Sequence, residues 1–272
     1  MTALLSLLDR IVDLVFRLLR PLPLFAVLGL FSVLTAVLSL LVIRWTSDQK
    51  AIRRVKDRIG AHVLAVRLFP DQLGVVLRAY LTLLGNTFLY LRHTFRPLLF
   101  LALPLLLLFV QLEAYLGRTP LVPGQDFFVR ATFQSPDALG GAVLQLPSGL
   151  LLAAPPVHIP SERQVDWRLK AVQPGTYDIR LVLPGSEYSK RVIVGDSVTR
   201  IVAARERGGL WQQIVNPGEA PLPRAGIVEQ IQIEYPARLF RLRTWEMEWL
   251  VPYLVLTLLG ALVLKGALRT EL

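Results

Sequence analysis

The residues of this chain that could do chemistry lie in and just after one apolar run. Residues 21–43 carry no charge, and Arg44 follows them directly. Ser32, Thr35 and Ser39 recur within the run at a spacing that places them on one face of a helix. Hydroxyls in this pattern either let helices pack closely or line a hydrophilic groove. Arg44 either reaches the headgroups as an anchor or offers a positive charge to acidic segments of another protein.

A single groove built from all four residues needs a distorted helix, because Arg44 lies about 120–140° from the hydroxyl stripe on a straight one. If the helix is distorted in this way, the candidate groove residues are Arg44, Ser32, Thr35 and Ser39. Such a groove would bind an acidic segment of another protein by electrostatic attraction. A second group of cations follows on the next segment, where it could contact a client or partner protein: Arg53, Arg54, Lys56 and Arg58.

The sequence lacks the patterns of catalysis and of metal binding. His62, His93 and His158 lie far apart, and the chain contains no cysteine. It has no phosphate-binding loop and no nucleophile elbow, so we expect neither an enzyme nor a cofactor. Glu246 and Glu248 fit anchoring at a membrane interface better than acid–base work. The net charge of +10 is concentrated in one loop, which favours membrane orientation over nucleic-acid binding.

Three apolar runs predict three transmembrane helices. The 23 residues of the first run cover about 35 Å at about 1.5 Å per residue, enough for a hydrocarbon core of about 30 Å. Residues 97–112 and 249–264 are also free of charge, but each run has only sixteen residues and covers about 24 Å. Such short spans thin the bilayer or rely on flanking cations that reach the headgroups. The predicted spans are residues 21–44, 97–117 and 245–265.

The charges of the loops predict the orientation. Residues 45–96 hold nine lysines and arginines against three acidic residues, which makes this segment cytoplasmic. Apolar residues recur there at helical spacing on both sides of Pro70, which predicts a helical hairpin. The N-terminus and residues 118–244 then lie outside, and the tail 266–272 lies inside. We expect a multi-pass protein of the plasma (inner) membrane, in contact with membrane lipids.

Residues 1–20 predict an amphipathic helix. Its charged residues, Asp9 and Asp13 among them, fall within about 100° of one another, and apolar residues cover the rest of the surface. Such a helix lies along a membrane surface, and Pro21 and Pro23 break it before the first span. The alternative is a helix that packs against the membrane bundle.

Residues 118–244 predict a β-rich domain. Residues 175–183 alternate between apolar and polar, and pairs of proline and glycine separate several other strand-like runs, including 198–203. Short strands at this spacing favour an immunoglobulin-like β-sandwich between spans two and three. Four aromatic residues are predicted to belong to its core: Trp167, Tyr177, Tyr188 and Trp211.

The layout resembles the YidC/Oxa superfamily of membrane protein insertases, in particular the three-span branch related to the third subunit of the endoplasmic reticulum membrane protein complex. The residues that carry the resemblance are Leu-Val-Ile-Arg44 running into Ser47-Asp-Gln-Lys50, and Arg96-Pro-Leu-Leu-Phe-Leu-Ala-Leu-Pro104 at the start of the next span. The resemblance implies a groove open to the cytosol and to lipid, with Arg44 as its cation. It also implies nascent or client membrane proteins and other membrane subunits as partners, and no nucleotide.

Two other functions fit the same sequence. The chain could be a membrane-anchored binding protein whose β domain recognises a partner in the envelope. It could also be a structural subunit that docks through an apolar helix of the hairpin.

Overall fold

The chain forms two structural units. The computed structural model describes residues 2–46, 85, 87, 95, 98–242 and 244–268. The helical unit comprises Leu24–Leu106 and Leu250–Leu272, and the β unit comprises Met1–Pro23 and Leu107–Trp249. The predicted cytoplasmic hairpin at 45–96 lies outside the described residues, except for residues 85, 87 and 95.

Two helices in the described part of the chain are long and apolar enough to cross a membrane: Leu24–Trp45, within α2 (Leu24–Thr46), and Leu98–Gly117. A third helix, α6 (Leu250–Leu268), has a shorter apolar stretch at Leu250–Gly266. The sequence predicted that this last helix begins at residue 245. It begins at Leu250, because residues 245–248 pair as a β-strand instead.

Small and hydroxyl side chains let α2 and α6 pack closely within the helical unit. Ser32, Thr35 and Ala36 are all buried on α2. A Cβ built at Gly260 of α6 would lie 3.3 Å from the Cβ of Ala36, which leaves little room for a larger residue. Small residues at a helix crossing are typical of membrane helices, where van der Waals contact is the main attraction between helices.

Most of the remaining apolar surface of these helices is uncovered. Only 39% of the most apolar stretch of Leu24–Trp45 is buried, and only 28% of that of Leu98–Gly117. The core helix of a soluble protein is mostly buried, and neither of these two helices is. Exposed side chains on α2 and α6 include Phe25, Leu30, Val33, Leu34, Val251, Leu254, Leu258 and Leu262.

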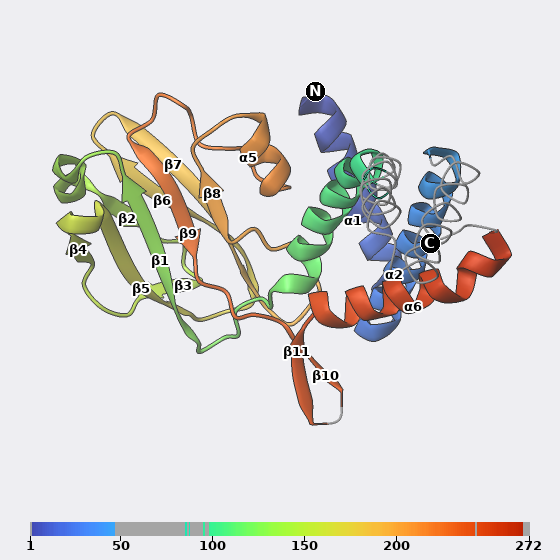
Figure 1. Cartoon of the computed structure of the whole chain (residues 1–272). Helices are drawn as coiled ribbons and strands as arrows, with labels where there is room; N and C mark the ends of the chain where they lie inside the picture. Colours follow the sequence, from blue (N-terminus) through green and yellow to red (C-terminus); the bar gives the residue numbers. More distant parts are fainter. Residues whose placement is uncertain are drawn as a thin grey trace, which may run out of the picture. The chain divides into compact units, whose positions relative to one another are not determined.

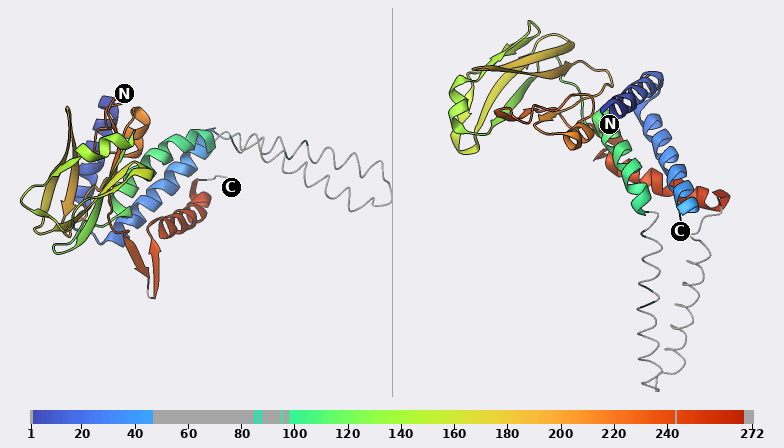
Figure 2. Two further views of the ribbon diagram at one scale, coloured as in Figure 1. Left: turned by 90° about the vertical axis from the view of Figure 1, so that its left-hand side faces the viewer. Right: turned by 90° about the horizontal axis from the view of Figure 1, so that it is seen from above.

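The β domain consists of two antiparallel sheets around one core (Figure 1). The larger sheet has the strand order β3-β5-β1-β9-β8, with β4 also paired to β5, and the smaller sheet has the order β2-β6-β7. Figure 2 shows both sheets from two further sides. The strands are β1 (Asp126–Phe133), β2 (Val143–Gln145), β3 (Leu150–Leu152), β4 (Val157–Ile159), β5 (Gln164–Ala171), β6 (Gly175–Leu183), β7 (Ser186–Val194), β8 (Ala204–Glu206) and β9 (Val228–Ile233).

Hydrophobic alternation places the core of this domain. Ile179, Leu181 and Leu183 of β6 are buried, while the residues between them are exposed or partly exposed, as the pattern of 175–183 predicts. Of the predicted core aromatics, Trp167 and Tyr188 are buried in the shared core and Tyr177 is half-buried against it. The fourth, Trp211, lies on the short helix α5 (Leu210–Val215) with 59% of its surface exposed, so its assignment to the core is wrong.

The segment 198–203 is not a strand, contrary to the sequence prediction. Its backbone instead contacts the end of the helix Leu98–Gly117, where Glu113–Gly117 widens into the π-helical turn η1. The amide of Ile201 donates to the carbonyl of Ala114 at 2.7 Å. This bond diverts the chain after β7 from the sheet toward the helix end.

Three further features complete the β unit. The N-terminal helix α1 (Thr2–Leu19) has the predicted extent. A separate hairpin of β10 (Leu239–Leu242) and β11 (Trp245–Glu248) stands apart from the two larger sheets (Figure 1). Two 3-10 turns lie in loops of the β domain, η2 (Pro136–Gly141) and η3 (Pro160–Glu162).

Gly260→Leu is expected to destabilise the helical unit by about 1–3 kcal/mol, because the new side chain meets Ala36 at the crossing. Gly266→Leu is the matched control, since a Cβ there meets nothing within 4 Å. Both changes raise helix propensity equally. Thermal unfolding of the full chain in detergent measures the difference, and equal midpoints for the two variants would contradict the close crossing.

Candidate functional site

Two of the predicted groove residues take part in the contact between α2 and α6. Ser32 donates a hydrogen bond from its hydroxyl to the carbonyl of Tyr253 at 3.3 Å. The hydroxyl oxygens of Thr35 and Tyr253 lie 2.8 Å apart in a second hydrogen bond. Both residues are almost fully buried, so their hydroxyls are used within the protein.

The other two groove candidates remain accessible. Ser39 is half-buried and Arg44 is exposed near the end of α2. The structure therefore does not bring the four residues into one open face. The predicted client-contact residues Arg53, Arg54, Lys56 and Arg58 lie outside the described residues.

A polar cluster that the sequence did not predict joins α1 to the β domain. The guanidinium of Arg200 lies 3.0 Å from the carboxylate of Asp9 and 2.9 Å from that of Asp13, and it also donates to the backbone carbonyl of Asp9 at 3.0 Å. The side chain of Arg200 is only 10% exposed. Gln111 donates to the carboxylate of Asp9 at 2.7 Å, and the hydroxyl of Tyr115 donates to Asp13. We call Arg200, Asp9, Asp13, Gln111 and Tyr115 the Arg200 cluster.

Aromatic contacts reinforce this cluster. The ring of Tyr115 stacks on that of Phe16, with centroids 3.8 Å apart and planes 2° from parallel. The guanidinium of Arg200 lies 5.3 Å from the centroid of the same tyrosine ring, within the range of a cation–π interaction. Tyr115 therefore contacts both α1 and Arg200.

Glycine is required beside the cluster at Gly218. Its φ of +95° is a left-handed conformation that other residues adopt at a cost, and a Cβ there would lie 2.6 Å from Cδ of Arg200. Gly218 thus leaves room for the side chain of Arg200.

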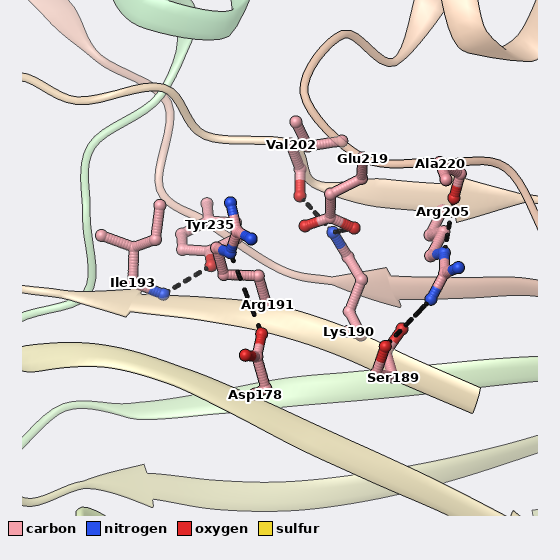
Figure 3. A network of polar contacts seen from close by, with 10 residues as sticks. All are labelled: Asp178, Ser189, Lys190, Arg191, Ile193, Val202, Arg205, Glu219, Ala220 and Tyr235. Carbon is pink, nitrogen blue, oxygen red and sulfur yellow. Dashed lines mark hydrogen bonds and ion pairs between the residues drawn. The ribbon is translucent and has the colours of Figure 1, made fainter. Parts of the chain in front are cut away.

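A second buried cation lies on β7. Lys190 has no exposed side-chain surface, and its ammonium donates to the carboxylate of Glu219 at 2.9 Å and to the carbonyl of Val202 at 2.6 Å (Figure 3). Burial lowers the pKa of Lys190 below its ordinary value of 10.5, and the charge of Glu219 opposes that change. Arg205 links two neighbouring segments of the β domain, because it donates hydrogen bonds to the backbone carbonyls of Ser189 and Ala220 (Figure 3).

The sequence holds a partial signal for these contacts. Asp9 and Asp13 are four residues apart, so a helix places both carboxylates on one face, where a single guanidinium can bind them. Nothing in the local sequence identifies Arg200 as the partner, because it lies 187 residues from Asp13.

No group of three or more His, Asp or Glu residues in the described ranges could hold a metal ion. The cations and carboxylates of the Arg200 cluster and of the Lys190–Glu219 pair are bound to one another, which suits a structural role.

No family model, no curated protein and no solved structure matches this chain.

Arg200→Met is expected to release α1 from the β domain, because it leaves Asp9 and Asp13 without their cation. Loss of one partner of a buried ion pair costs about 3–5 kcal/mol. Hydrogen exchange of the full chain in detergent should show faster exchange of the amides of α1. Arg168→Met is the control, since its ion pair with Asp126 is half-exposed and its loss should leave α1 protected. Unchanged exchange in Arg200→Met would contradict the docking role.

Glu219→Gln is expected to destabilise the chain by about 3–5 kcal/mol, because it leaves the Lys190 ammonium buried and unpaired. The double variant Lys190→Met, Glu219→Gln should recover most of that loss, since it removes the buried charge as well. Denaturant titrations of the full chain in detergent, followed by tryptophan fluorescence, give the three free energies.

The pH dependence of the Glu219→Gln variant supplies a further check. The folded state binds fewer protons than the unfolded state between the lowered pKa of Lys190 and 10.5, so stability rises with pH across that window. Without Glu219 the pKa of Lys190 falls further, so the lysine of the variant loses its proton at a lower pH. The loss of unfolding free energy caused by Glu219→Gln should therefore become smaller as the pH is raised. A penalty that is constant with pH would contradict a charged lysine in the core.

Proposed function

We propose that the chain is an integral membrane protein that helps membrane segments of other proteins to insert. It has three spans, an N-terminal helix and β domain outside, and a basic hairpin and C-terminus in the cytoplasm. It works by binding, without catalysis or a cofactor, and its clients are nascent or newly made membrane proteins.

The observation that carries this proposal is the short apolar length of α6. The stretch Leu250–Gly266 covers about 26 Å, less than a hydrocarbon core of about 30 Å, and α6 packs against the longer α2. A bilayer that thins to match α6 lowers the cost of moving a polar segment across it. A locally thinned membrane is part of the mechanism of the YidC/Oxa superfamily, which the sequence resembles.

The polar surface offered to a client is restricted by the contacts of Tyr253. Because Ser32 and Thr35 already bond to Tyr253, the proposal relies on Ser39 and Arg44, the two candidates that remain accessible. Arg44 supplies the positive charge that attracts an acidic tail at the cytoplasmic side.

The strand order supports an immunoglobulin-like class for the outer domain. The neighbours β3-β5-β1 and β2-β6-β7 follow the order of strands D-E-B and C-F-G in immunoglobulin domains. The strand β9 takes the place beside β1 that strand A occupies there. An isolated parallel bridge between Leu121 and Val194 of β7 adds a short edge contact to the second sheet.

A second candidate function is recognition of an envelope partner by the β unit. Trp211 on α5 and Trp245 on β11 have 59% and 73% of their surfaces exposed, and exposed tryptophans are enriched in protein interfaces. In this case the spans would serve only as an anchor.

Insertion by purified full-length protein in proteoliposomes tests the first proposal. The client is a single-span protein with a short acidic N-terminal tail, and protease protection of the tail measures insertion. Arg44→Ala should reduce insertion several-fold, while Arg44→Lys should retain it because the charge remains. Lys265→Ala is the control, as it removes an exposed cation near the end of α6. Equal insertion by all three variants and the original protein would overturn the role of Arg44.

Excision of the β domain separates the two candidate functions. The chain enters and leaves this domain at one place, where Thr119 donates to Pro236 and Arg238 donates to Gly117, each at 2.9 Å. Replacing residues 120–235 by a short glycine–serine turn preserves this connection. If the chain is an insertase, this variant retains insertion. If the β domain is a receptor, the variant loses its partner. Complete loss of insertion with correct membrane assembly would favour the receptor.

A further inference from the structure

A partly open cavity of about 510 Å³ lies within the β unit, between the end of α1, the strands β6 and β7, and the segment after β7. Its volume is in the range of small-molecule sites in proteins, about 300–1,000 Å³. Arg17 and Arg20 border it from the end of α1, and Arg191 borders it from β7. The cavity is thus lined by cations from segments that are more than 170 residues apart in the sequence.

The acidic groups beside the cavity are already bound to other cations. Asp13 belongs to the Arg200 cluster, and Glu219 is held by Lys190. Arg191 has only a long, exposed ion pair with Asp178, at 3.8 Å (Figure 3).

Arg17 and Arg20 supply the surplus positive charge. Within the described part of the chain, neither guanidinium lies within ion-pair distance of a carboxylate. The cavity therefore has positive charge available for an anion.

Hydroxyl groups complete the lining. Thr176, Ser197 and Thr199 border the same cavity. Arginines together with hydroxyls are suited to phosphate, because its oxygens accept several hydrogen bonds at once and the guanidinium fork matches their spacing. A carboxylate ligand has fewer acceptor oxygens for so many donors.

We propose that this cavity binds a phosphate group, carried either by an anionic phospholipid headgroup or by a soluble phosphate compound. The inference goes beyond the proposed insertion of clients and does not depend on it. Arg17 and Arg20 bind the phosphate from α1, and Arg191 binds it from β7.

The surface of α1 offers a way for the end of this helix to approach lipid. Opposite Asp9 and Asp13, the helix exposes an apolar stripe at helical spacing, with 51–70% of each side chain uncovered: Leu7, Ile11, Leu14 and Leu18. A helix that rests on a membrane by this stripe brings its C-terminal end, where Arg17 and Arg20 lie, close to the headgroups, which the long arginine side chains can reach.

Thermal unfolding of the full-length protein in neutral detergent tests the proposal with three titrants. They are inorganic phosphate, dioctanoyl phosphatidylglycerol, and dioctanoyl phosphatidylcholine as the zwitterionic lipid control. We expect the phosphatidylglycerol to raise the midpoint in a saturable manner, as a ligand of the native state does, and phosphatidylcholine to have a much smaller effect. Stabilisation by phosphate together with none by phosphatidylglycerol would support the site and assign it to a soluble phosphate compound.

Charge-removing variants locate the effect. Arg17→Gln, Arg20→Gln and Arg191→Gln should each weaken the apparent affinity at least tenfold, while their unliganded midpoints stay close to that of the original protein. Arg10→Gln is the matched control, since Arg10 is an exposed cation of α1 that does not border the cavity. An equal loss of apparent affinity in Arg10→Gln, or no stabilisation by either anionic titrant, would overturn the proposal.

Discussion

The buried guanidinium of Arg200 is the group on which the arrangement of the β unit depends. A buried charge is tolerated only when opposite charges and hydrogen bonds compensate it, and Arg200 finds both on α1. Tyr115 and Gln111 bring the end of the second apolar helix to the same carboxylates. One arginine therefore connects the first helix, the end of a later helix and the segment that follows β7.

This docking reverses the usual orientation of an amphipathic helix. The two acids of α1 face the protein, and its leucine stripe faces outward. The exposed stripe and the largely uncovered faces of α2 and α6 have the same physical consequence, because such apolar surfaces are unfavourable in water. In each unit, taken by itself, lipid or a protein partner would remove such surface from water.

The hydroxyl stripe of the first apolar run illustrates why the same residues allow two interpretations. Spacing alone places Ser32, Thr35 and Ser39 together, but it does not say whether the face that they share is open or packed. Tyr253, more than 200 residues away, decides this by bonding to Ser32 and Thr35. Lys190 is a similar case, since a charged residue in an alternating strand would be expected to face solvent, yet its ammonium is satisfied internally by Glu219 and Val202.

The sequence by itself determined the elements whose signals are local: the amphipathic α1, the long apolar α2 and the alternating strands β1, β5, β6 and β7. Periodicity and charge-free length set these, because each depends on residues within a few turns or one strand. Tertiary structure alone decided that 198–203 leaves the sheet, that Trp211 is exposed, that 245–248 pairs as a strand and that Arg200 joins α1. The contact of Arg200 with α1 and the departure of 198–203 from the sheet both depend on partners far away in the chain. Local sequence patterns do not contain such partners, so these contacts are decided only when the chain has folded.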